Sequence, residues 1–293
     1  MKKAEAFEKV RAQIIELMQR DGVNWTKSWI TTGAPCNFTT KKPYRGMNNF
    51  WLSIQGFESN EWGSFKQWSE AGYKIRKGSK ANFVVFGEMR DKKESWLTPE
   101  ERAKFKASGV LPKYFFWNVH SRMFNADQIE GYEAPSVVSN HSQELTAEGA
   151  LLIDSFIKGT GAKIAQHGQP HYSPITDSIG MPNIRSLFSD VDYYSTLLHE
   201  LTHWTGHKTR CNRDQSGTFG SEDYAREELV AEIGSAFLCR LHGVEKTVRE
   251  DHAAYLNSWI EIIRESDSAL SSAFTKAQEA VDFLDTKAQE VAA

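Results

Sequence analysis

SDVDYYSTLLHELTHWTGH, residues 189–207, predicts one helix with a signal at each end. Ser189 followed three positions later by Asp192 is a variant of the capping box that starts helices, and Gly206 is a residue type that commonly ends them. His199 and His203 are then one turn apart on the same face of that helix. Two imidazoles at this spacing can bind one zinc ion, so the stretch predicts a metal site.

Glu200, directly after the first histidine, completes the pattern H-E-x-x-H. A carboxylate in this position lies near the metal's open coordination position and can take a proton from water. The motif is short, and the alternative is a pair of partly exposed histidines on an amphipathic helix. The leucines around the motif and the helix cap favour the metal site, and the pattern resembles that of the zincin metallopeptidases.

The third ligand is not expected to be His207, because this residue follows the glycine that should end the helix. In the metzincin pattern a histidine stands three residues after the glycine, where this chain has Thr209. We therefore expect the third ligand on a second helix, which begins near Ser221 and contains YAREELVAEIGSAFLCRL.

Two acids of this second helix, Glu228 and Glu232, are one turn apart amid apolar residues, on a face that should be buried. We expect Glu228 to complete a His₂Glu zinc site and Glu232 to hold a ligand histidine through its second ring nitrogen. Glu227 competes for the ligand position, but it points about 100° away from Glu228, so only one of them can face the metal. Glu228 is preferred because Glu232 shares its face. The order of the two motifs resembles gluzincin-like and ArdC-type carboxy-terminal domains.

Other segments of this half bear on the same site. Tyr224, four residues before Glu228, could donate a hydrogen bond to an oxyanion or be a packed core tyrosine. ALLIDSFIKGTGA predicts a helix, KIAQHG and QPHYS predict short strands, and DSIGMPNIRSLF predicts an edge strand that could align an extended substrate. The loop of residues 208–224 is a candidate gate, and two amphipathic helices end the chain.

The composition is that of a soluble globular protein, with 40% hydrophobic and 25% charged residues. No apolar run approaches the roughly 20 residues of a membrane helix, and the amino terminus does not resemble a secretory signal. Cys36, Cys211 and Cys239 are odd in number and widely spaced, which disfavours a disulfide framework and favours a reducing cytoplasm.

The net charge of −3 hides two unlike parts of the chain. Residues 1–130 contain 22 Lys and Arg against 14 Asp and Glu, whereas residues 131–293 contain 13 against 24. The first part also contains 21 of the 35 aromatic residues. The length favours two domains, so we expect a first domain over residues 1–131, a linker over 132–144 and a second domain over 145–293.

The first domain mixes helical and strand patterns, so we expect an α+β fold. An amphipathic helix opens the chain, SFKQWSEAG predicts a short helix, and ANFVVFGEMR and KYFFWNVHSRMFN predict strands. Aromatic and basic side chains together can bind single-stranded DNA through its bases and phosphates, although aromatics more often fill a core. The candidates for DNA contacts are Trp25, Trp29, Lys41, Lys42, Tyr44, Arg45, Asn48, Asn49, Trp51, Lys74, Arg76, Lys77 and Lys80.

Four segments of the first domain carry a family resemblance. NWTKSW, APCNFTTKKPYRGMNNFWL, SFKQWSEAGYKIRKGSKANFVVF and FNADQIEG resemble the amino-terminal domain of ArdC-type antirestriction proteins, which is also found attached to plasmid primases. The resemblance covers nearly all of residues 1–132. It implies that this domain binds single-stranded DNA and that the protein protects incoming plasmid DNA from host restriction.

The sequence thus predicts a cytoplasmic two-domain protein, in which an α+β DNA-binding domain precedes a mainly helical, zincin-like peptidase domain with a small sheet. The expected cofactor is Zn²⁺ or another divalent transition metal, with Glu200 as general base in peptide hydrolysis. The expected partners are single-stranded DNA and a DNA-associated or restriction-system protein as substrate, with no membrane. One alternative is that the protein coats DNA and the metal only stabilises the fold. Another is that the first domain recognises a protein.

Overall fold

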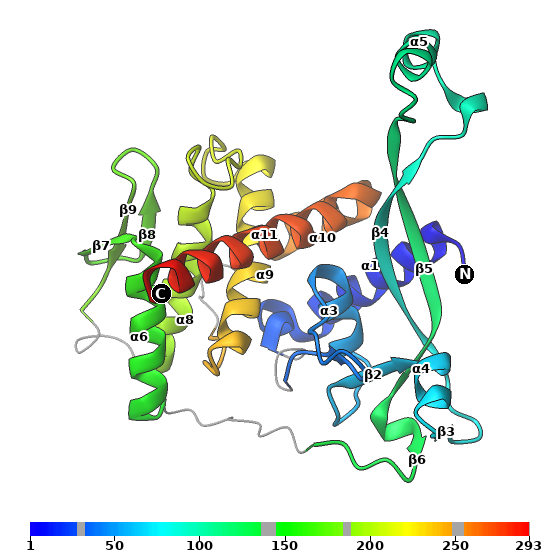
Figure 1. Ribbon diagram of the computed structural model, residues 1–293. Helices are drawn as coiled ribbons and strands as arrows, with labels where there is room; N and C mark the ends of the chain where they lie inside the picture. The colour runs from blue at the N-terminus through cyan, green and yellow to red at the C-terminus, as the bar shows by residue number, and fades with distance from the viewer. Residues whose placement is uncertain (28–32, 136–144, 184–188, 248–254, 293) are drawn as a thin grey trace.

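The computed structural model describes residues 1–27, 33–135, 145–183, 189–247 and 255–292. Within these residues an α+β amino-terminal part is followed by a mainly helical carboxy-terminal part with a small sheet, which confirms the predicted fold class (Figure 1). No helix in the described part of the chain is long and apolar enough to cross a bilayer.

The amino-terminal part is built on a four-stranded sheet in the order β1-β2-β5-β4. Its strands are β1 (Cys36–Asn37), β2 (Glu61–Ser64), β4 (Asn82–Asp91) and β5 (Lys113–Asn125), and β3 (Lys74–Ile75) pairs separately with β6 (Ile129–Glu130). Its helices are α1 (Lys3–Asp21), α3 (Gly46–Ser53), α4 (Phe65–Glu70) and α5 (Pro99–Ser108), with short 3-10 turns η1 (Gly22–Thr26), η2 (Glu94–Trp96) and η3 (Ala126–Gln128). The predicted opening helix, short helix and two long strands are all present.

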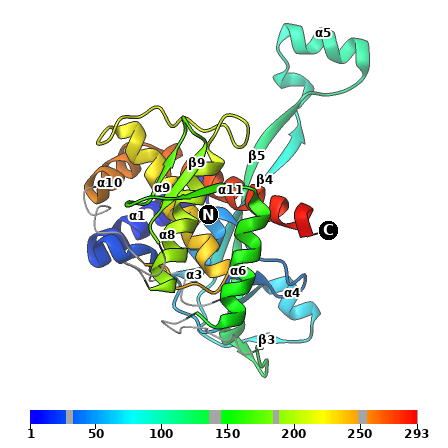
Figure 2. The same cartoon turned by 90° about the vertical axis from the view of Figure 1, so that its left-hand side faces the viewer.

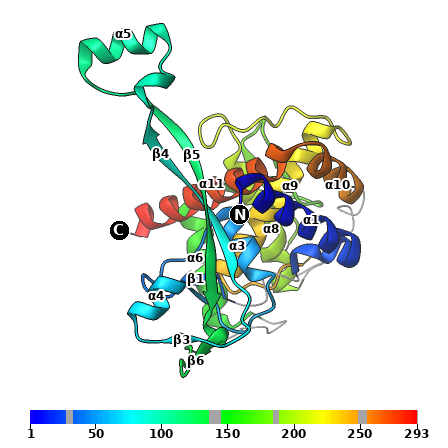
Figure 3. The same cartoon turned by 90° about the vertical axis from the view of Figure 1, so that its right-hand side faces the viewer.

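Strands β4 and β5 form a long antiparallel ribbon that extends away from the body of the molecule (Figures 1 and 3). Its regular register runs from the pair Val84 and His120 to the pair Asp91 and Lys113. Helix α5 closes the far end of the ribbon and has no buried residue. A capping box formed by Thr98 and Glu101 starts this helix. We call the ribbon beyond Val85, together with α5, the arm.

The carboxy-terminal part combines helices with a three-stranded sheet in the order β7-β9-β8. The strands are β7 (Lys163–Gln166), β8 (His171–Ser173) and β9 (Ser178–Met181). The helices are α6 (Ala147–Thr160), α8 (Asp190–Thr205), α9 (Glu222–Leu241), α10 (Leu256–Glu265) and α11 (Asp267–Ala292). The two amphipathic helices predicted at the end of the chain are α10 and α11.

The prediction of an edge strand in DSIGMPNIRSLF was wrong, because β9 lies between β7 and β8. The strand is buried from Ile179 onward, as a central strand should be. A Cβ at Gly180 would lie 2.4 Å from the His171 ring and 2.9 Å from the His167 Cβ, so the glycine lets both side chains cross the strand. The edge nearer the predicted metal helix is β8, which contacts α8.

The two parts of the chain share one apolar core. Helix α1 packs on α10, and α3 packs on α11, where Phe50 and Phe274 have ring centroids 5.3 Å apart. Arg240 of α9 donates hydrogen bonds to Asn49 Oδ1 and Ser53 Oγ of α3. Helix α9, which carries the predicted third metal ligand, is therefore anchored on the amino-terminal part (Figure 2).

Candidate metal centre

Helices α8 and α9 pack against each other and bring the predicted ligands together. Each begins at a serine cap: Ser189 accepts a hydrogen bond from Asp192 N, and Ser221 accepts one from Tyr224 N. The helices cross closely at Gly234, where a Cβ would lie 2.6 Å from Thr202 Cγ2. This glycine in the middle of α9 is thus required by the approach of α8.

His199, His203 and Glu228 converge on one point in the structure. One ligand atom from each lies within 4.8 Å of the others. The two Nε2 atoms are 3.1 Å apart, and the Glu228 carboxylate oxygens lie 3.3 Å from His199 Nε2 and 3.4 Å from His203 Nε2. Two imidazole nitrogens and one carboxylate are the donor set of a catalytic zinc site, so these residues fit a divalent metal. Glu227 does not join this group.

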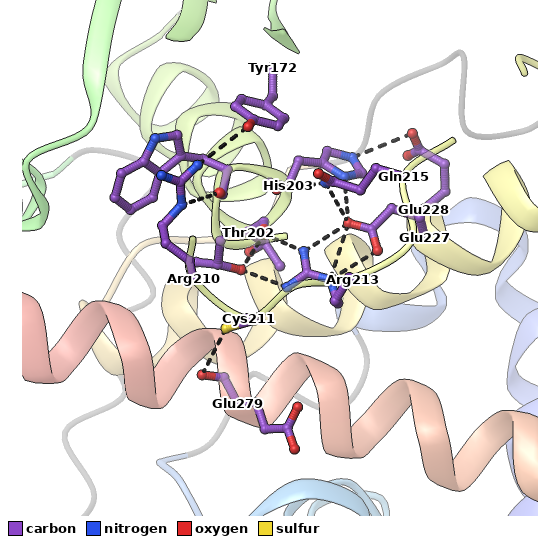
Figure 4. Close-up of polar contacts among 12 residues, drawn as sticks. Tyr172, Thr202, His203, Arg210, Cys211, Arg213, Gln215, Glu227, Glu228 and Glu279 are labelled. Carbon is purple, nitrogen blue, oxygen red and sulfur yellow. Dashed lines mark hydrogen bonds and ion pairs between the residues drawn. The ribbon is translucent and has the colours of Figure 1, made fainter. Parts of the chain in front are cut away.

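Glu227 instead contacts the other nitrogen of His203. Its Oε1 lies 3.2 Å from His203 Nδ1, so it can accept the proton of that nitrogen and leave Nε2 to the ligand cluster. Arg213 donates to both Glu227 oxygens, at 2.9 Å to Oε2 from Nε and 2.8 Å to Oε1 from NH2 (Figure 4). Gln215 also donates to Glu227, at 3.1 Å. Sequence reasoning had Glu227 only as a rival ligand and missed this network.

Glu232 has the matching place beside His199. Its Oε1 lies 3.4 Å from His199 Nδ1, and its Oε2 lies 3.5 Å from Lys246 Nζ. Lys246 is only 1% exposed, so its charge is available to Glu232 with little screening by water. Each histidine therefore has a carboxylate at its second nitrogen, and each of these carboxylates has a buried cation.

The charges of this cluster shift the pKa values of its members. Burial lowers the pKa of His203, but the charge of Glu228 and the contact with Glu227 outweigh it and raise the pKa to about 10. Burial raises the pKa of Glu228, yet the two imidazoles hold it well below its usual range. Without a metal the cluster thus retains a proton on its imidazoles, which a cation would have to displace.

The end of α8 is shaped by the loop that follows it. Gly206 ends the helix as predicted, but its φ of −68° is right-handed, so it is not the left-handed residue of a Schellman motif. A Cβ there would lie 2.4 Å from Gln215 Nε2 and 3.0 Å from Arg213 NH2. The glycine is needed because these two side chains pass over the helix end. His207 is directed elsewhere, with its Nδ1 2.9 Å from Thr209 Oγ1.

A cleft of about 210 Å³ opens beside the three converging residues. Glu200, which is 3% exposed, lines it together with Tyr224. Burial, the charge of Glu228 and a hydrogen bond to Glu228 raise the pKa of Tyr224, so its hydroxyl stays a donor at neutral pH. The other walls come from β8 with its flanking residues and from the loop of residues 208–224, including Phe219. An extended chain in the cleft would therefore meet β8.

Two aromatic candidates for DNA contacts are in the core. Trp25 is 0% exposed and Trp51 is 8% exposed, stacked on Phe83 at 4.6 Å, so neither can stack on a base and these two predictions were wrong. Tyr44 is half-buried and accepts a hydrogen bond from Asn37. Trp29 lies outside the described residues.

The two asparagine candidates also have structural partners. Asn48 pairs with the backbone of Val85, donating to its carbonyl at 2.6 Å and accepting from its N–H at 2.8 Å. Asn49 is buried and accepts from Arg240. These side chains hold α3 against the sheet and against α9, so the structure contradicts their assignment to DNA.

The basic candidates are exposed. Arg45 pairs with Asp282 of α11, and Lys41 pairs with Glu61. The remaining candidates are Lys42, Lys74, Arg76, Lys77 and Lys80, and all of them are exposed. The last four lie in and after β3, immediately before the ribbon strand β4. Two exposed aromatics of the arm, Phe86 and Trp96, were not among the predicted candidates. No signal in ANFVVFGEMR indicated Phe86, because burial changes along this strand, from the buried Phe83, Val84 and Val85 to the exposed Phe86, where the ribbon leaves the body.

Models of two known protein families match the two parts of the chain. Residues 4–115 match the model of the N-terminal domain of anti-restriction factor ArdC, and residues 152–276 match that of a zincin-like metallopeptidase. The chain is 31% identical to the uncharacterized protein y4eC of Sinorhizobium fredii, over 96% of this chain and 91% of that protein. It is 34% identical to a DNA primase TraC of Escherichia coli over 94% of this chain, but spans only 27% of that longer protein.

Two solved structures of one relative superpose on nearly the whole chain. The metal-free antirestriction ArdC protein from plasmid R388 has a TM-score of 0.79 and 30% identity, covering 97% of this chain and 98% of its own. Its Mn(II)-bound form has a TM-score of 0.76 and 30% identity, covering 96% and 97%. This likeness in sequence, domain order and fold shows that the chain belongs to the ArdC family of antirestriction proteins.

Proposed function

We propose that this protein is a divalent-metal-dependent peptidase that acts on proteins close to single-stranded DNA. The observation that carries the proposal is the convergence of His199, His203 and Glu228 beside a cleft lined by Glu200. The relative from plasmid R388 has a Mn(II)-bound structure, which supports a divalent cation at this donor set. Zinc is the cation that His₂Glu sites of peptidases most commonly hold.

The bound cation would supply Lewis acidity, lowering the pKa of a water toward ~7 and polarising the scissile carbonyl. Glu200 would take the proton of the attacking water and deliver it to the amine that leaves when the C–N bond breaks. Tyr224, a hydrogen-bond donor at neutral pH, would stabilise the negative charge that develops on the carbonyl oxygen. Strand β8 would align the peptide through main-chain hydrogen bonds.

Attachment to a DNA-binding part would bring this peptidase close to proteins that are bound to the same DNA strand. A protein that holds a DNA strand raises the effective concentration of its peptidase domain near other proteins on that strand. The family to which the chain belongs makes antirestriction the biological setting, in which incoming plasmid DNA is protected from host restriction. We place this activity in the cytoplasm, where the three free cysteines Cys36, Cys211 and Cys239 would stay reduced.

A second function is supported by the position of the same cluster between α8 and α9. A cation there would also crosslink two core helices, so the protein could protect DNA by coating it while the metal only stabilises the fold. The variant Glu200→Gln separates the two functions, since Glu200 is outside the converging group. We expect it to keep its metal and its DNA binding but to lose protection in a plasmid-transfer assay against a restricting host. Full protection by folded, metal-loaded Glu200→Gln would overturn the peptidase and favour coating.

A further inference from the structure

One face of the arm carries a row of aromatic side chains together with the basic Arg90. The antiparallel register places Phe86 opposite Asn118, Glu88 opposite Phe116 and Arg90 opposite Tyr114. Residues directly opposite each other, and alternate residues along a strand, share a face of the ribbon. Phe86, Phe116, Tyr114 and Arg90 therefore lie on one face of the ribbon.

The side chains of this face contact one another in series along the ribbon. The Arg90 Cζ lies 3.9 Å from the centroid of the Phe116 ring, and Arg90 also forms an ion pair with Glu88. The ring centroids of Phe116 and Tyr114 are 6.2 Å apart, and those of Tyr114 and Trp96 are 5.5 Å apart. Trp96 lies in η2, before α5. Lys93 Nζ lies 5.3 Å from the Trp96 ring. We call Phe86, Phe116, Tyr114 and Trp96 the aromatic row.

Two members of the row, Phe86 and Trp96, are exposed, and the other two, Tyr114 and Phe116, are half-buried. Trp25, Trp62 and Trp68 are essentially fully buried, whereas Trp96 is 53% exposed and Phe86 is 42% exposed. The neighbouring helix α5 has no buried residue and does not cover them. Large aromatic surfaces left in water on a projecting element are a sign of a binding face.

We propose that the aromatic row of the arm is a stacking platform for single-stranded DNA. This inference rests on the DNA-binding half of the proposed function and assigns it to a surface. Aromatic rings accept every base by stacking, and the guanidinium beside the Phe116 ring adds a planar, cationic group for a base or a phosphate. The bound DNA strand would continue toward four exposed basic residues that precede β4 at the body end of the ribbon: Lys74, Arg76, Lys77 and Lys80. These lysines and Arg76 would neutralise phosphates.

The test is binding of fluorescently labelled oligo(dT) of about 20 nucleotides, longer than the roughly 4–16 nucleotides that such platforms cover. We expect Trp96→Ala and Phe116→Ala each to weaken binding by about tenfold, as the loss of one stacked base predicts. Arg90→Met should lower the slope of log affinity against log salt by about 0.7, the effect of one phosphate contact on single strands. Phe65→Ala is the matched control, because Phe65 is equally exposed, at 53%, but lies on α4 away from the arm.

The outcomes separate this inference from the function on which it rests. If all three arm variants bind the oligonucleotide as tightly as the wild type, the stacking platform is refuted, and DNA binding belongs to another surface. No wild-type binding at low salt would overturn both. A second measurement does not depend on any variant: ultraviolet crosslinking of wild-type protein to a bromodeoxyuridine oligonucleotide. We expect the modified peptides to fall within residues 86–118, and crosslinks confined to other segments would contradict the proposal.

Discussion

The candidate metal centre and the arm use similar side chains in opposite environments. At the metal centre the charged groups of Arg213, Lys246 and Glu232 are all at least 90% buried, and each has a partner of opposite charge. On the arm, Arg90 and Trp96 are in water, and α5 buries no residue. Buried polar groups need hydrogen-bond or ion-pair partners within the protein, so a buried cluster can be identified from the distances among its members. Exposed side chains can be solvated by water, so a binding role for the aromatic row has to be tested with a ligand.

The largest expected effect is the loss of metal on removal of a ligand. Replacement of second-sphere carboxylates costs about 10–100-fold in metal affinity. Glu228→Gln should exceed that range, because it removes the only anionic member of the converging group. Competition with a chromophoric chelator and mass-spectrometric metal content would measure it. The arm variant Trp96→Ala serves as control, with wild-type metal content, and stoichiometric metal in Glu228→Gln would refute the ligand assignment.

The next effect is on stability and contrasts two arginines of one loop. Arg213→Met removes the buried guanidinium that donates to both oxygens of Glu227, so we expect a loss of about 3–5 kcal/mol in the free energy of unfolding. Arg210→Met breaks a pair with Asp177, whose side chain is 39% exposed, and should cost less. Urea denaturation of the metal-free proteins compares them. Equal losses would mean that burial does not distinguish the two ion pairs.

Metal binding should release protons. Because the pKa of His203 is raised to about 10, the metal-free protein carries that proton at pH 7–9 and must give it up to a cation. One released proton makes the metal affinity rise about tenfold per pH unit. Calorimetry in buffers of different ionisation enthalpy would detect it, and a binding enthalpy independent of the buffer would contradict it.

The same raised pKa fixes the sign of a stability change in the metal-free protein. The folded pKa of His203 is above its unfolded value near 6.5, so its stabilising contribution is complete below about pH 6.5 and is lost as the pH rises through about 10. The melting temperature of the metal-free protein should fall over this interval, and that of the metal-loaded protein should fall less.

The smallest expected effect is on the stability of the arm variants. Trp96→Ala and Arg90→Met alter exposed side chains outside the core, so their unfolding free energies should stay within about 0.5 kcal/mol of wild type. Together with weakened DNA binding, this would mark the row as a binding surface. A loss of several kcal/mol would mean that the row instead stabilises the fold.

The metal centre was more accessible to sequence reasoning than the arm for a physical reason. The spacing of His199 and His203 fixes their common face within one helix, and the same period relates Glu228 to Glu232. Arg213 and Lys246 have no such signal, because they reach the carboxylates from segments outside those two helices and tertiary packing places them. Residue type alone did not separate a buried Trp25 from an exposed Trp96, since both are aromatic residues near basic ones.

The order of the strands in the carboxy-terminal sheet also depends on tertiary packing and could not be predicted from the sequence. The pattern of β9 identified a strand, but its central position depends on pairing with both β7 and β8, which a single segment does not encode. The role of Gly206 was likewise predicted from helix endings, whereas the structure relates it to the close approach of Gln215.

The coordination of the cation itself tests the account most directly. Extended X-ray absorption at the zinc edge of the zinc-loaded protein should show two imidazole nitrogens at about 2.0–2.1 Å with additional oxygen ligands at about 2.0–2.2 Å. In Glu228→Gln, any remaining zinc should show an altered oxygen shell while both imidazoles persist. A spectrum with no imidazole ligands, or with three, would contradict a site built from His199, His203 and Glu228.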